Sequence, residues 1–314
     1  MDFSQVITSS LEVVRAHQQN QPIVALESTV ITHGLPRPQN LALAQDMEQA
    51  VRAEGAVPAT IAILDGKIQA GLNPGQLERL SNADDAIKIS LRDFATALVK
   101  GKPGGTTVAG TMFVAQKTGI QVFATGGIGG VHKEAHLDVS TDLQALASIP
   151  MIVVCAGAKS ILDLPATLEY LETLGVPVVG YGTDKFPEFF STGGKLPVSV
   201  RLDTPEEVAA FASTHWGLGM HSAVLVCQPL PDHLAIPSAE IAPILEQVSN
   251  EVRERQKTNS MTGQEVTPYE LRRVNELSHG RSMQANLALL TNNARLAGKL
   301  ARSLNSYARQ SRPL

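Results

Sequence analysis

The chain has 314 residues, a formal net charge of -4, 43% hydrophobic residues and only 4% aromatic residues. This near-neutral charge and low aromatic content argue against a nucleic-acid-binding or membrane-surface protein. No segment approaches the roughly 18 consecutive apolar residues of a membrane span, and the N-terminus lacks the features of a signal peptide. We therefore expect a cytoplasmic protein, in which the two cysteines, Cys155 and Cys227, are buried thiols within apolar runs.

Helical spacing of apolar residues alternates along the chain with short apolar runs, a pattern typical of α/β proteins. The predicted helices span residues 4–18, 41–54, 74–80, 108–118, 141–147, 160–174, 205–216, 238–257, 268–278 and 282–303. The predicted strands span residues 23–26, 59–64, 67–71, 87–90, 120–125, 151–156, 176–181, 198–202 and 223–227. We predict a single domain, residues 1–314, with a mostly parallel central sheet flanked by helices in α/β/α layers and a helical C-terminal third.

Three turns and loops punctuate the first part of this pattern. Asp65-Gly66 indicates a hairpin between two strands. The two prolines and the glycine of Thr32–Pro38 argue against regular structure and place His33 in a turn. Gly101–Thr107 is predicted to be a glycine loop that ends at a helix N-cap.

Lys159 stands just beyond the end of a predicted buried strand, Met151–Ala156. Ligands of open α/β sheets bind at the carboxyl ends of the strands. A partly desolvated ammonium there would have a lowered pKa and could act as a nucleophile. A lysine that only reaches the rim of the sheet is the alternative.

The glycine clusters do not match nucleotide-binding motifs. In Gly126–His132 the third glycine of a dinucleotide fingerprint would fall on His132, and in Gly157–Ser160 the P-loop glycine before the lysine is Ala158. Both clusters can still present backbone N–H groups to a phosphate or carbonyl oxygen.

The polar segment that follows contains candidate metal ligands. In His132–His136 the position where the metalloprotease pattern needs glutamate is Lys133, and the later cysteines of the deaminase pattern are missing. Asp138 and Asp142 flank Ser140, so they could form a carboxylate site for Mg²⁺ or Mn²⁺. Alternatively, Ser140 caps a helix and Asp142 lies in its first turn.

Two further charged residues lie in or after short apolar strands. Glu27 directly follows one strand and is either a structural acceptor or a general acid with a raised pKa. Lys88 lies between two isoleucines, where an apolar residue is expected, and this favours an anion-binding role.

Several long motifs together resemble the pseudouridine-5'-phosphate glycosidase family, which includes the indigoidine synthase A proteins. They are Val24–Gly34, Val57–Ile63, Thr106–Met112, Val122–His132, Asp138–Leu143, Val154–Asp163 and Asn292–Ala294. The resemblance extends from about residue 20 to the C-terminal helices.

The resemblance implies a reversible lyase that cleaves the C–C glycosidic bond of pseudouridine 5'-phosphate to give uracil and ribose 5-phosphate. It also implies a bound Mn²⁺ and a homotrimer. By position, the implied roles are: Lys159 as nucleophile, Glu27 as proton donor, Asp138 as metal ligand, Lys88, Val108, Ser140, Thr141 and Asp142 as substrate contacts, and His132 near the sugar. The loop Lys133–Leu137 is shorter than is usual in the family, which leaves a role for His136 in doubt.

The implied chemistry suits these residue types. A carbon-linked base cannot leave as an ordinary glycoside, but opening the ribose exposes C1' to condensation with a lysine amine. The uracil carbon can then be protonated while the C–C bond breaks, and the lysine carries C1' as an iminium. The alternatives are a sugar-phosphate aldolase that uses the same lysine and a non-catalytic pyrimidine nucleotide-binding protein.

Overall fold

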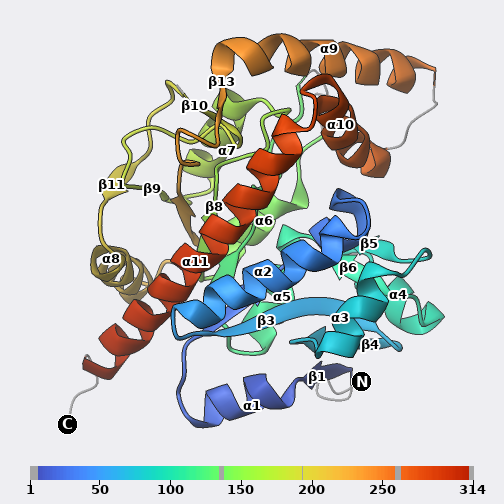
Figure 1. The fold of residues 1–314 in the computed structure, drawn as a ribbon. Helices are drawn as coiled ribbons and strands as arrows, with labels where there is room; N and C mark the ends of the chain where they lie inside the picture. Colours follow the sequence, from blue (N-terminus) through green and yellow to red (C-terminus); the bar gives the residue numbers. More distant parts are fainter. Residues whose placement is uncertain (1–5, 134–137, 193, 259–262, 311–314) are drawn as a thin grey trace.

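The computed structural model describes residues 6–133, 138–192, 194–258 and 263–310 (Figure 1). Its main sheet has 11 strands: β1 (Ile7–Ser9), β2 (Ile23–Leu26), β3 (Val57–Leu64), β4 (Lys67–Ala70), β5 (Ile87–Ile89), β6 (Gly104–Thr106), β7 (Val122–Ala124), β8 (Ile152–Cys155), β9 (Val178–Tyr181), β11 (Val200–Leu202) and β12 (Val224–Cys227). A separate parallel pair consists of β10 (Ser191–Thr192) and β13 (Ile236–Pro237).

The strand order is β1-β4-β3-β2-β7-β8-β12-β9-β11, and β6 joins β3 to β5. All pairs from β3–β2 through to β9–β11 are parallel, whereas β3 runs antiparallel to β4 and β6. The helices are α1 (Leu11–Gln18), the π-helix η2 (Val30–Gly34), α2 (Gln39–Ala53), α3 (Pro74–Ser81), α4 (Phe94–Lys100), α5 (Val108–Lys117), α6 (Thr141–Ser148), α7 (Leu164–Thr173), α8 (Pro205–Gly217), α9 (Ser238–Lys257), α10 (Gly263–Leu277) and α11 (Arg281–Gln310).

Apolar residues at successive positions of a strand point to opposite faces of the sheet and pack into two separate cores. Along β8, Val153 and Cys155 join the core formed with α5 and α6, whereas Ile152 and Val154 join the core formed with α2, α8 and α11. This alternation is the period of two expected for a strand covered on both faces. The predicted mostly parallel sheet in α/β/α layers is confirmed, as is the helical C-terminal third.

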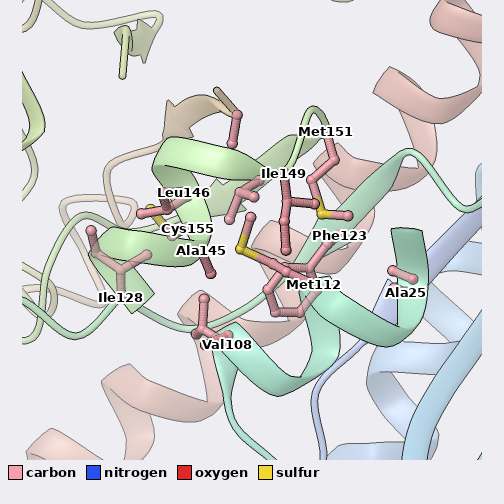
Figure 2. Close-up of a cluster of buried hydrophobic side chains, with 14 of the residues drawn as sticks. Ala25, Val108, Met112, Phe123, Ile128, Ala145, Leu146, Ile149, Met151 and Cys155 are labelled. Carbon is pink, nitrogen blue, oxygen red and sulfur yellow. The ribbon is translucent and has the colours of Figure 1, made fainter. Parts of the chain in front are cut away.

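Figure 2 shows part of the first core, in which Met112 of α5, Phe123 of β7 and Met151 come together. All three side chains are fully buried. Fixed packing of this kind positions the strand ends that carry the candidate site.

The two cysteines are free and buried, as predicted. Cys155 of β8 and Cys227 of β12 are direct partners in the parallel register, and their Sγ atoms are 3.7 Å apart.

The predicted helix 4–18 is wrong at its start, because Ile7–Ser9 form β1 and pair with β4. Residues 4 and 5 lie outside the described residues. The side chain of Ser10 accepts a hydrogen bond from Val13 N (3.2 Å) and so caps α1, which starts at Leu11. Backbone pairing at the sheet edge thus overrides the helical spacing of the apolar residues.

Two segments predicted to lack regular structure are partly regular. Val30–Gly34 form a π-helix at whose start Ile31 N and Thr32 N both donate to Ser28 O. Gly104–Thr106 form β6, where a Cβ on Gly104 would lie 2.5 Å from Ile89 Cγ1. The glycines of this segment permit close strand approach.

The predicted helix 160–174 starts later than expected, at Leu164. The Asp163 side chain accepts from Ala166 N (3.0 Å) and caps α7. The residues Lys159–Leu162 instead form a turn closed by Leu162 N donating to Lys159 O (3.0 Å). The sequence patterns also missed α4, β10 and β13.

No described helix combines the length and the apolar character needed to cross a membrane. Even α11, with 30 residues, carries polar side chains throughout its length.

Candidate active site

A cavity of about 730 Å³ opens at the carboxyl ends of β2, β5, β7 and β8. Every site residue predicted from the sequence lines it, although these residues are scattered between positions 27 and 159. They are Glu27, Lys88, Val108, His132, Asp138, Ser140, Thr141, Asp142 and Lys159. The fold therefore brings the predicted residues together. The role of each residue has to be argued from its contacts and its charge.

Lys159 is half-buried and held by its backbone at the end of β8. Lys159 N donates to Ile128 O (3.1 Å), and Ile128 N donates to Gly157 O (3.1 Å). This pairing continues the β7–β8 ladder beyond the strands, so the lysine and the glycine cluster after β7 are placed by the same hydrogen bonds.

Gly157 makes the turn before Lys159 possible. Its φ is +86°, in the left-handed region, and a Cβ there would lie 2.0 Å from Pro187 O. We expect Gly157→Ala to destabilise the fold by about 2 kcal/mol or more and to lower activity by displacing Lys159. Urea unfolding and turnover would measure both effects.

Gly55→Ala is the matched control for Gly157→Ala. Gly55 has a similar φ of +76°, but a Cβ there meets nothing within 4 Å. Equal losses of stability in the two variants would show that contact with Pro187 plays no part.

Glu27 lies at the end of β2, beside the end of β7. Its carboxylate accepts a hydrogen bond from Thr125 Oγ1. Burial raises the pKa of Glu27, and the positive charge of Lys159 opposes that rise. A carboxyl group with a raised pKa can hold a proton near neutral pH, as a general acid must.

Lys88 lies on β5 with its side chain at the cavity, as the sequence predicted. Burial lowers the pKa of Lys88, and the neighbouring charge of Lys159 lowers it further. His33, which the sequence placed in a turn, belongs to η2 and also lines the cavity. Burial lowers the pKa of His33 and so favours its neutral form.

Ser140 and Asp142 have the structural roles that the sequence offered as an alternative. Ser140 Oγ accepts from Asp142 N (3.2 Å) and caps α6. The two carboxylate oxygens of Asp142 accept from Ala109 N (3.0 Å) and Gly129 N (2.8 Å). Asp142 thus ties the start of α5 to the glycine cluster after β7.

The start of α5 is a candidate anion site. Thr107 is its N-cap, and Thr107 Oγ1 accepts a hydrogen bond from Gly110 N (3.3 Å). Ala109 N donates its hydrogen bond to the Asp142 carboxylate. Val108 N–H is the first amide of the helix, a position without a partner inside the helix. An apolar residue can therefore contact an anionic ligand here through its backbone.

His132 and Asp138 are joined by a hydrogen bond from His132 N to Asp138 O (3.0 Å). Burial lowers the pKa of His132, and the charge of Asp138 opposes this. His136 lies outside the described residues. Among the described residues, no three His, Cys, Asp or Glu side chains gather as metal ligands. The Asp138 carboxylate is an oxygen ligand of the kind that Mg²⁺ and Mn²⁺ accept.

The sequence patterns missed the wall contributed by α10 and α11. This wall includes Pro268, Leu271, Asn286 and Leu290. Close by, Glu270 is only 5% exposed, and burial raises its pKa to about 8 against the opposing charge of Lys159. Helical spacing alone assigns residues at such positions to the hydrophobic core. The polar residues Asn286 and Glu270 at these positions were the sequence signal that could have indicated a cavity wall.

Residues 12–303 match the family model described as indigoidine synthase A like protein. The chain therefore belongs to the indigoidine synthase A-like family of enzymes.

Its relatives include two bacterial proteins named pseudouridine-5'-phosphate glycosidase. The one from Geobacillus kaustophilus (strain HTA426) is 50% identical over 298 residues, covering 94% of this chain and 98% of that protein. The one from Paracoccus denitrificans (strain Pd 1222) is 49% identical over 303 residues, covering 95% and 98%. The predicted resemblance is confirmed.

Two solved structures share the fold. An indigoidine synthase A-like protein from Thermotoga maritima has a TM-score of 0.86 and 37% identity, covering 96% of this chain and 97% of that chain. The prealnumycin C-glycosynthase AlnA, solved in complex with ribulose 5-phosphate, has a TM-score of 0.86 and 39% identity, covering 98% and 99%.

Proposed function

We propose that this enzyme reversibly cleaves the C–C glycosidic bond of pseudouridine 5'-phosphate to uracil and ribose 5-phosphate through a Schiff base on Lys159. The observation that carries the proposal is one cavity that contains a half-buried amine, Lys159, and a half-buried carboxyl with a raised pKa, Glu27. The names of the relatives supply the substrate, and the ribulose 5-phosphate bound to AlnA supports a pentose phosphate ligand.

In the first stage, the Lys159 amine forms a bond to C1' of the ribose while the bond from C1' to the ring oxygen breaks and that oxygen takes up a proton. The amine loses a proton and leaves a neutral, ring-opened adduct. This stage needs an unprotonated amine next to a proton donor.

In the second stage, Glu27 donates a proton to C5 of uracil. The bond between C1' and C5 then breaks, its electron pair restores the uracil double bond, and the lysine nitrogen lone pair forms the C=N bond of an iminium. Water hydrolyses the iminium, which releases ribose 5-phosphate and the free amine. Asp142, another carboxyl group that lines the cavity, has both oxygens engaged by backbone N–H groups.

Lys88 and the Val108 N–H are suited to hold the 5'-phosphate, since one supplies a charge and the other a helix N-terminal amide. Ser140 and Thr141 line the same cavity and His132 stands across from Asp138, which supports their proposed contacts with the substrate. We also propose that the enzyme forms a homotrimer, which sedimentation analysis would test.

Asp138 would hold a Mn²⁺ ion, which would act as a Lewis acid toward an oxygen of the substrate. We expect Asp138→Ala to make activity insensitive to added Mn²⁺, because the anionic ligand is lost. Titrating Mn²⁺ into metal-depleted wild-type and variant enzymes would measure this. Undiminished metal dependence in the variant would place the metal elsewhere.

Borohydride trapping tests the covalent step. The enzyme is incubated separately with ribose 5-phosphate and with uracil, reduced, and mapped by mass spectrometry. We expect a reduced pentose phosphate adduct on Lys159 with ribose 5-phosphate and none with uracil. The absence of an adduct on any lysine would contradict the Schiff base.

Assays with further compounds separate the alternatives. Cleavage of deoxyribose 5-phosphate without any turnover of pseudouridine 5'-phosphate would favour an aldolase. Binding of the nucleotide without turnover or adduct would favour a binding protein, although such a protein has no need of a nucleophilic amine.

A further inference from the structure

Two buried side chains that the proposed reaction does not use connect α11 to Glu27. Thr125 Oγ1 donates to the Glu27 carboxylate. Asn293 Nδ2, from α11, donates to Thr125 O (2.8 Å) and Gly126 O (3.3 Å). Thr125 is 0% and Asn293 1% exposed, so neither is in a position to contact a bound substrate.

The sheet explains why Thr125 meets Glu27. Leu26 of β2 is the register partner of Ala124 of β7, so the residues that follow them stand side by side at the carboxyl ends of two parallel strands. Thr125 N in turn donates to Val154 O of β8 (2.9 Å). The backbone of Thr125 is thus held both by the sheet and by α11, and its hydroxyl is held by the hydrogen bond to Glu27.

We propose that Thr125 is a positioning residue for Glu27, holding its carboxyl group toward the cavity, and that Asn293 fixes Thr125 in that place. This inference rests on the proposed function, because it assigns a role to the acid of that reaction.

The electrostatics indicate what such a contact does. Burial raises the pKa of Glu27, and the charge of Lys159 and the Thr125 hydrogen bond lower it, whereas Asp142 raises it and Lys88 lowers it. A donated hydrogen bond favours the carboxylate over the acid. Thr125 therefore stabilises the anion that Glu27 becomes when it gives up its proton, which makes Glu27 a stronger acid.

Thr125→Val removes the hydroxyl with little change of shape, and Thr125→Ser retains it. Activity requires protonated Glu27 and falls as pH rises through its pKa. We expect this high-pH limb of the kcat profile to move upward by about one pH unit in the valine variant, the effect of one lost hydrogen bond to a charged group. We further expect kcat to fall about tenfold with little change in KM, and the serine variant to restore both the limb and the rate.

Asn293→Asp tests the second link, because a carboxylate cannot donate to the two carbonyl groups. We expect a loss of kcat without a matching rise in KM. A wild-type high-pH limb in Thr125→Val would overturn the role of Thr125. A wild-type kcat in Asn293→Asp would overturn the role of Asn293.

A double variant separates positioning from general damage. In a Glu27→Gln background there is no acid to position, so adding Thr125→Val should lower the residual rate no further. A further tenfold loss would contradict the proposal. Borohydride trapping distinguishes failure of the proposed function from failure of this inference. The absence of a Lys159 adduct in the wild type would overturn the proposed function and this inference with it. A Lys159 adduct together with an unchanged high-pH limb in Thr125→Val would overturn the inference alone.

Discussion

Lys159→Ala is expected to lower turnover of pseudouridine 5'-phosphate by more than about a thousandfold, the order of loss when a covalent nucleophile is removed. The methyl side chain cannot form a bond to C1', so the ring-opened adduct has no route to form. The same variant should give no borohydride adduct with ribose 5-phosphate. Turnover and adduct are measured on one preparation.

The fold should tolerate this substitution. Lys159 is half-buried, and its backbone hydrogen bonds, from Lys159 N to Ile128 O and from Leu162 N to Lys159 O, do not involve the side chain. Lys102→Ala is the matched control, since Lys102 is a lysine paired with Asp85 on the surface and is not among the residues that line the cavity. Near-normal turnover in Lys159→Ala would exclude the Schiff base.

Glu27→Gln should reduce kcat by roughly a hundred- to ten-thousandfold, the usual contribution of a general acid. Glutamine keeps the shape and can still accept from Thr125, but it has no acidic proton to give to uracil C5. The wild-type pH profile should lose activity as pH rises through the pKa of Glu27, and burial places this limb above that of an exposed glutamate. The limb should be absent in the glutamine variant.

Glu48→Gln is a useful comparison for Glu27→Gln. Glu48 is also a carboxyl whose pKa is raised by burial and that accepts a hydrogen bond from a threonine, Thr60. It lies on α2 and is not among the residues that line the cavity. We expect it to leave the pH profile unchanged. A high-pH limb that persists in Glu27→Gln would assign the acid to another group, and Glu270, whose pKa burial raises to about 8, is one candidate.

The strand ends could be predicted from the sequence, and the site largely follows from them. Glu27 and Lys159 directly follow apolar runs, and parallel strands collect such positions at one edge of the sheet. Ser140 and Asp142 carry the local signature of a helix start, which does not depend on distant residues. The resemblance to a family then joined these positions into a single site.

The remaining features depend on contacts that no local pattern encodes. Ile7–Ser9 form a strand because they pair with β4 at the edge of the sheet. Gly104–Thr106 form a strand because they pair with both β3 and β5. Asn293 appears in the sequence as one polar residue on a long helix. Its amide has a defined role because α11 packs against β7, a contact between residues 168 positions apart.

The course of α11 has a consequence for how the enzyme is made. Figure 1 shows α11 crossing the molecule beside α2, and it packs against β2, β7 and β8. Since it follows every strand of the sheet in the chain, a ribosome releases the earlier elements first. The nascent α/β layers then hold Lys159 and Glu27 but lack the wall that α11 supplies through Asn286 and Leu290. Lys159 is therefore enclosed on this side only after α11 has been synthesised and has docked onto the earlier layers.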